Sequence, residues 1–181
     1  METRREFLTT MGAGLTGIAA GNEYPGRAEA VPPSLEFAFT ATVTLGIIQP
    51  VGDVPHGNRR IIPITGGKFE GPAIKGTVEP GGADWQLVRT DHVAELDAKY
   101  MLKTDDGTLI YVVNRGYRHG PADVLQRLSK GEEVDPGEYY FRTATTFETA
   151  SKKYDYLNKY IYVATGERKK DSVIIHFYRV L

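Results

Sequence analysis

The stretch LEFAFTATVTL, residues 35–45, alternates strictly between apolar and polar side chains. Its odd-numbered residues, from Leu35 to Leu45, are all apolar, whereas most of the even-numbered ones are glutamate or threonine. Neighbouring side chains of an extended chain point to opposite faces, so this pattern predicts a strand with one buried face. A fold built on such strands is all-β.

Runs of the same kind follow at short intervals and are rich in Val, Ile, Thr, Tyr and Phe, which favour strands. One helix is predicted at 122–131, where Val124, Leu125 and Leu128 have helical spacing and Gly131 can end the helix. We expect a single antiparallel β-barrel of about eight or nine strands with one short helix, similar in general shape to a calycin or lipocalin. The expected further strands are 59–65, 67–78, 84–90, 94–103, 108–115, 138–147, 159–166 and 172–180.

Glycine is concentrated in one part of this pattern, GGKFEGPAIKGTVEPGGADWQ, residues 66–86, which holds six glycines. Glycine adopts backbone angles that other residues avoid, so we expect these residues to shape barrel corners and bulges. A second turn is predicted at Asp105, Asp106 and Gly107, between two strand-like runs.

Composition excludes several kinds of partner and cofactor. With 22 basic and 23 acidic residues the chain has no excess of positive charge that would attract nucleic acid. It has no cysteine, and its four histidines are scattered without metal-binding spacing, so we expect no metal. Gly12, Gly14 and Gly17 have the spacing of a dinucleotide fingerprint, but no strand precedes them, so we expect no cofactor.

The N-terminus has the layout of a twin-arginine export signal. Arg4 and Arg5 precede a weakly apolar run, and small residues around Ala28 to Ala30 resemble a cleavage site. Residues 1–30 would then be removed by way of the twin-arginine export machinery, which carries folded proteins, and 31–181 would form the mature barrel domain. This predicts a periplasmic or secreted protein without a stable membrane anchor. The alternative is an ordinary amphipathic N-terminal helix.

Four longer stretches carry a resemblance to a known family. They are GGKFEGPAIKGTVEPGGADWQLVRTD, ELDAKYMLKTDDGTLIYVVNRG, EYYFRTATTFET and YDYLNKYIYVATG. Together they resemble domain of unknown function 3237 over roughly residues 35–181. The resemblance implies a compact β-barrel-like fold and no settled reaction. Tyr156 stands where the family is expected to have tryptophan, in a W-L-N sequence.

Asp84 and Trp85, after the Gly81–Gly82 turn, are the first site candidates. Alternation along a strand directs Asp84 and Trp85 to opposite faces. If Asp84 lines the barrel interior, burial raises its pKa and suits it to acid or base catalysis. The alternative is that Asp84 caps a turn and Trp85 fills the core.

Further candidates lie in EYYFRTATTFE and on the strands before it. Tyr140 and Arg142 share one face of their strand, and the arginine needs a partner, either Asp84, Glu148 or the carboxylate of a substrate. An internal salt bridge without a ligand is the alternative. Tyr100 and Tyr111 fit simple core aromatics with satisfied hydroxyls better, and the wall of a cavity is the alternative.

Two classes of function follow. The first is a cofactor-free enzyme that isomerises, cyclises or hydrates an aromatic or carboxylated organic molecule. Asp84 or Glu148 would be the acid or base, Arg142 would orient an anion, and Trp85, Tyr100, Tyr140 and Tyr111 would bind the substrate. The second is a periplasmic small-molecule binding protein with a similar pocket. Free sheet edges would allow a homodimer, but nothing in the sequence requires one.

Overall fold

Antiparallel strands make up most of the computed structural model, which describes residues 31–181; the predicted export signal lies outside these residues. One α-helix, α1 (Ala122–Ser129), and two short 3₁₀ helices, η1 (Pro136–Glu138) and η2 (Asp155–Asn158), accompany them. The strands are β1 (Leu35–Leu45), β2 (Gln49–Val54), β3 (Gly57–Glu70), β4 (Lys75–Val88), β5 (Ala94–Thr104), β6 (Leu109–His119), β7 (Tyr140–Glu148), β8 (Tyr162–Arg168) and β9 (Ser172–Val180).

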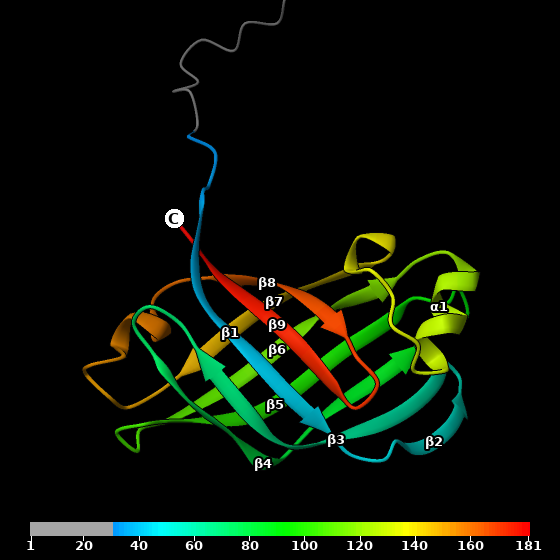
Figure 1. Cartoon of the computed structure of the whole chain (residues 1–181), viewed down its shortest axis with the longest axis horizontal. Coiled ribbons are helices and arrows are strands. Elements are labelled where there is room, and N and C mark those ends of the chain that lie inside the picture. The colour runs from blue at the N-terminus through cyan, green and yellow to red at the C-terminus, as the bar shows by residue number, and fades with distance from the viewer. Residues whose placement is uncertain (1–30) are drawn as a thin grey trace, which may run out of the picture. The chain divides into compact units, whose positions relative to one another are not determined.

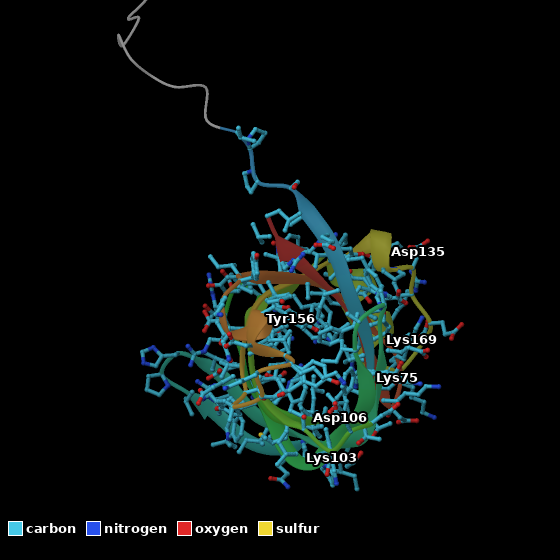
Figure 2. The ribbon with its side chains drawn as sticks, turned by 90° about the vertical axis from the view of Figure 1, so that its left-hand side faces the viewer. Lys75, Lys103, Asp106, Asp135, Tyr156 and Lys169 are labelled. Atoms are coloured by element: carbon cyan, nitrogen blue, oxygen red, sulfur yellow. The ribbon has the colours of Figure 1, made fainter. Side chains whose placement is uncertain are left out.

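Eight of these strands close into a barrel. They pair in the order β1-β9-β8-β7-β6-β5-β4-β3, and β1 also pairs with β3, which completes the ring. Strand β2 pairs with the outer edge of β3 and lies outside the ring (Figure 1). Figure 2, which looks along the barrel from the end opposite α1, shows the ring of strands filled with side chains. The predicted barrel is confirmed, and β2 is a strand that the sequence pattern did not predict.

The core lies inside this ring, and its aromatic part is well defined. The Phe39 ring packs against Phe177 with centroids 4.6 Å apart and against Phe147 at 5.6 Å. Tyr162 meets the Phe147 ring edge-on at 4.9 Å. Such rings remove large apolar areas from water and fill the narrow interior of an eight-stranded barrel. From Pro33 to Leu181 the chain forms one compact unit around this core.

The glycine-rich stretch bends two strands and also contains the turn between them, because β3 ends at Glu70 and β4 begins at Lys75. Strand β3 continues through Gly66 and Gly67, where its pairing with β4 shifts register, and both have positive φ angles. A second shift lies between Glu79 and Ala83, where β4 pairs with β5. The predicted bulges are confirmed, but the predicted strand ends near residues 66 and 79–83 are wrong, because glycine accommodates a bulge inside a continuous strand. The single strand predicted at 67–78 is also wrong, because the turn at 71–74 divides it between β3 and β4.

The helix and the hairpin turn lie as predicted. Helix α1 ends before Gly131, which has φ of +76° and donates its backbone N–H to Leu128. Gly107 has φ of +85° in the turn that joins β5 to β6. Within residues 31–181, no helix is long and apolar enough to cross a membrane.

Candidate functional site

A cavity of about 400 Å³ lies at the end of the barrel beside α1. This outer cavity is in the size range of sites for small organic ligands. Behind it, toward the barrel interior, lies an inner cavity of about 60 Å³, room for about two water molecules. Ile62, Arg118 and Arg168 line both cavities, so they form one continuous site with a wide mouth and a narrow inner end.

Asp84 lines the inner cavity. Strand β4 places it opposite Ile62 of β3 and Ala98 of β5. Its Oδ1 accepts the backbone N–H of Asp97 at 2.9 Å, and its Oδ2 accepts Nε2 of Gln86 at 2.9 Å. The oxygen of the same Gln86 amide accepts Nε of Arg60 at 2.7 Å. Gln86 therefore links the carboxyl to Arg60, and no salt bridge joins Asp84 to a cation among the described residues.

Burial raises the pKa of Asp84 above its ordinary value. The hydrogen bonds from Asp97 and Gln86 and the charges of Arg118 and Arg60 act in the opposite direction, but the loss of water around the carboxyl outweighs them. A carboxyl with a raised pKa retains its proton closer to neutral pH, so it can donate that proton to a bound molecule. The interior position predicted as one alternative for Asp84 is the one that the structure has.

Tyr100 of β5 also lines the inner cavity, and it is buried. Its hydroxyl has no hydrogen-bond partner among residues 31–181, and burial raises the pKa of the phenol, so the hydroxyl keeps its proton. A buried polar group without a partner costs about 1–3 kcal/mol. A ligand oxygen that reached Tyr100 would recover part of this cost. Tyr100 is thus both a core residue, as one reading of the sequence has it, and part of a cavity wall.

Three arginines surround the mouth of the cavity: Arg60 of β3, Arg118 of β6 and Arg168 of β8. None of them forms a salt bridge with a carboxylate within residues 31–181. The Nε atom of Arg118 is buried and has no hydrogen-bond partner. Burial, with repulsion from Arg60 and Arg168, lowers the pKa of Arg118 to about 10, so it is still a cation at neutral pH. The mouth therefore concentrates unpaired positive charge.

The predicted site residues on β7 point away from this cavity. Tyr140, Arg142 and Glu148 are exposed on the outer face, while the alternate residues from Phe141 to Phe147 are buried. Arg142 donates Nη1 to the carbonyl of Phe141 and lies 5.5 Å from the centre of the Tyr140 ring. The structure does not bring Arg142 or Glu148 to Asp84, because the strand's alternation directs them outward.

Trp85 and Tyr111 also lie on the outer face. Trp85 is the neighbour of Asp84 on β4, so it points the opposite way, with Lys99 Nζ 5.4 Å from its ring centre. Tyr111 of β6 is paired with Glu148 on the outside of the barrel. The expectation that Trp85, Tyr140 and Tyr111 wall a cavity with Tyr100 is therefore not met.

The three arginines were missed because they are far apart in sequence. The sequence does contain a pattern that could have found them. On each of these strands, every second residue faces inward, and the arginine is one of these inward-facing residues near the strand end. On β3, Arg60 lies on the same face as Ile62 and Ile64. On β8, Arg168 lies on the same face as Tyr162 and Ala164. The same holds for Arg118, which follows Ile110, Val112 and Asn114 on β6. Only closure of the barrel brings the three strand ends together.

A third cavity, of about 350 Å³, lies at the opposite end of the barrel. Tyr156 of η2, the position where the family resemblance implied tryptophan, lines it together with Tyr162 and Arg179. Figure 2 shows Tyr156 at this end. Among residues 31–181, no three His, Asp or Glu side chains gather in a way that could hold a metal ion.

Comparison with known proteins gives a family and several relatives. The model of the family described as "Protein of unknown function (DUF3237)" matches residues 33–180. A UPF0311 protein of Rhodopseudomonas palustris is 44% identical over 151 residues, which are 82% of this chain and 99% of that protein. Its crystal structure superposes with a TM-score of 0.80 at 42% identity, covering 84% of this chain and 100% of the other.

A fungal enzyme is a more distant relative. The hydroalkoxylation enzyme phnH of Penicillium herquei is 30% identical over 127 residues, which are 70% of each chain. Among solved structures, a β-barrel-like protein of Acinetobacter baumannii has a TM-score of 0.74 at 43% identity, with 84% of this chain and 98% of the other covered. The two bacterial structures thus share the barrel of this chain.

Proposed function

This chain belongs to the DUF3237 family, and on that premise we propose that it is a cofactor-free acid–base enzyme that cyclises or isomerises an aromatic or carboxylated organic molecule. The observation that carries the proposal is Asp84, a carboxyl of raised pKa that lines an apolar cavity and forms no salt bridge within residues 31–181. Perturbed carboxyls in a cleft are typical of catalytic acids and bases.

The reaction we propose is the addition of a hydroxyl group to a carbon–carbon double bond within one molecule. The name of the fungal relative, a hydroalkoxylation enzyme, describes this chemistry for that protein. In this chain, protonated Asp84 would give its proton to one alkene carbon while the substrate hydroxyl oxygen bonds to the other. The hydroxyl proton then returns to Asp84, so the product is an isomer of the substrate and the carboxyl is regenerated.

Neighbouring residues support each part of this scheme. Gln86 and the Asp97 backbone N–H hold the carboxyl in one orientation through the two hydrogen bonds at 2.9 Å. The Tyr100 hydroxyl, which lies in the cavity wall, can accept a hydrogen bond from the substrate hydroxyl, which would hold that oxygen toward the double bond and favour its attack. The apolar wall formed by Ile62, Leu96 and their neighbours excludes water, which would otherwise compete with the hydroxyl for the cation-like carbon.

The test is turnover in D₂O. The purified protein is incubated with phenols and carboxylic acids that carry both a double bond and a hydroxyl placed for ring closure. An enzyme of this kind gives a cyclic product with one deuterium on carbon, detected by mass spectrometry, because Asp84 exchanges its proton with solvent. Asp84→Asn should lower the rate by about 10²-fold or more. Glu148→Gln, which changes a carboxylate on the outer face, should leave the rate unchanged.

Two results would argue against the enzyme. Full activity of Asp84→Asn would remove Asp84 from the chemistry. Tight binding of such molecules with no product in any of them would favour the second candidate, a binding protein that uses the same cavity without catalysis. The outer cavity and its unpaired arginines support ligand binding in either case.

A further inference from the structure

We infer that Arg60, Arg118 and Arg168 together form an anion-binding site at the cavity mouth, which selects substrates carrying a carboxylate or phenolate. The inference deepens the proposed function because it names the substrate class of that same site. Binding of an anion can nevertheless be measured without turnover, so the two can fail separately.

The first argument is the balance of charge. The whole chain has a formal net charge of −1, yet three guanidinium groups line one cavity. The carboxyl that shares the site is Asp84, whose burial favours its neutral form. Asp171 attracts Arg168 from a distance but forms no salt bridge with it. Charges that are removed from water are usually paired, but these three guanidinium groups have no salt-bridge partner among residues 31–181.

The second argument is the hydrogen bonds that the arginines leave unmade. Arg60 donates Nε to Gln86 at 2.7 Å, and Arg168 donates Nη1 to the carbonyl of Ser172 at 2.9 Å. These hydrogen bonds hold the two side chains in place. Both acceptors are uncharged, so the hydrogen bonds do not neutralise the positive charge of either arginine. The Nε atom of Arg118 is buried and donates to no acceptor within residues 31–181. A planar carboxylate is the acceptor that fits a guanidinium with two parallel hydrogen bonds.

The third argument is position. Arg118 and Arg168 line both cavities and so stand where the outer cavity meets the inner one, which Asp84 and Tyr100 line, whereas Arg60 lines the outer cavity. An anion bound there would hold one end of a substrate and direct its other end toward Asp84. The outer cavity, at about 400 Å³, has room for an aromatic ring beside the anion.

The experiment uses salicylate as the probe and salicylamide, its uncharged amide, as the matched control ligand. Isothermal titration calorimetry and thermal unfolding are recorded on the full chain. Salicylate should bind and raise the melting temperature, and salicylamide should bind roughly tenfold more weakly or not at all. Equal binding of the two ligands would overturn the anion site.

Variants identify the residues. Arg118→Met and Arg168→Gln should each weaken salicylate binding by roughly tenfold or more, whereas Arg142→Gln, on the outer face, should not. Since Arg118 repels its neighbours, Arg118→Met should also unfold at a higher temperature than the wild type in anion-free buffer, which distinguishes lost binding from lost folding. Unchanged binding in both cavity variants, or an equal loss in Arg142→Gln, would overturn the assignment.

Asp84→Asn separates the inference from the proposed function. It should bind salicylate at least as tightly as the wild type, because it removes a carboxyl from the site and leaves the three arginines in place. If this variant binds but does not turn over, both proposals stand. If the wild type turns over neutral substrates as fast as anionic ones, the acid–base function stands and the anion site does not.

Discussion

Asp84 is the residue on which most of the proposed chemistry depends, and its surroundings shift its pKa in opposite directions. Two hydrogen bonds favour the carboxylate, whereas burial favours the neutral acid and has the larger effect. The pKa of the folded state therefore lies above the ordinary value of about 3.9 for an aspartic acid. A group of this kind titrates at a pH where the unfolded chain is already ionised.

The consequence is a pH-dependent cost in stability. Below the ordinary pKa, Asp84 is protonated in both the folded and the unfolded state, so it does not reduce the free energy of unfolding. As the pH rises, the unfolded chain ionises more readily than the folded state, so the free energy of unfolding falls until the pH has passed the raised pKa. Urea unfolding should therefore show that Asp84→Asn gains stability relative to the wild type as the pH rises from about 4 to about 8.

Asp155 of η2 provides a control, because its pKa is shifted in the opposite direction to that of Asp84. Hydrogen bonds from Lys159 and Asn158 lower the pKa of the exposed Asp155. Asp155→Asn should therefore lose stability relative to the wild type as the pH rises toward about 5. If Asp84→Asn followed the same direction as Asp155→Asn, the pKa of Asp84 would not be raised.

At the scale of strands, the predictable part of the site was the direction of side chains. Alternation placed Tyr100 with Leu96 and Leu102, and Asp84 opposite to Trp85, as the structure has them. For β7 the alternation was also correct, but both faces carry aromatic residues, so the sequence did not show which one is inside. The three arginines could not be placed together, because their proximity depends on which strands pair when the ring closes.

The bulge at Gly66 and Gly67 is the element that lets β3 close against β1. Gly67 has φ of +140°, and a Cβ there would lie 2.1 Å from the carbonyl oxygen of Thr42 on β1. Gly67→Ala should therefore reduce the free energy of unfolding by at least about 2 kcal/mol, through backbone strain and a clash that backbone atoms cannot easily relieve. Urea denaturation measures this difference.

Gly52 of β2 provides the comparison. It also has positive φ, at +104°, but no atom lies within 4 Å of the position that a Cβ would take. Gly52→Ala should thus show the cost of backbone strain alone, and a smaller loss than Gly67→Ala. Equal losses would mean that the approach of β3 to β1 does not constrain residue 67.

At the scale of the whole molecule, the barrel leaves residues 1–30 unexplained, and we propose that they are the twin-arginine signal that their sequence predicts. The family model begins at residue 33, just after the predicted mature start at Val31, which supports a boundary there. The closed ring supports the same proposal, because β1 and β9, from the two ends of this unit, must pair before the barrel is complete. A protein of this kind suits a route that carries folded chains.

Export is tested by expressing the full chain in a bacterium that has the twin-arginine machinery. Mass spectrometry of the periplasmic fraction should find a product that begins near Val31, and Lys replacements at Arg4 and Arg5 should leave the full-length chain in the cytoplasm. Lys replacements at Arg59 and Arg142, which lie in the barrel domain, serve as the matched control and should not affect export. A full-length periplasmic product would contradict cleavage at this site, and export that survives loss of Arg4 and Arg5 would contradict the twin-arginine route.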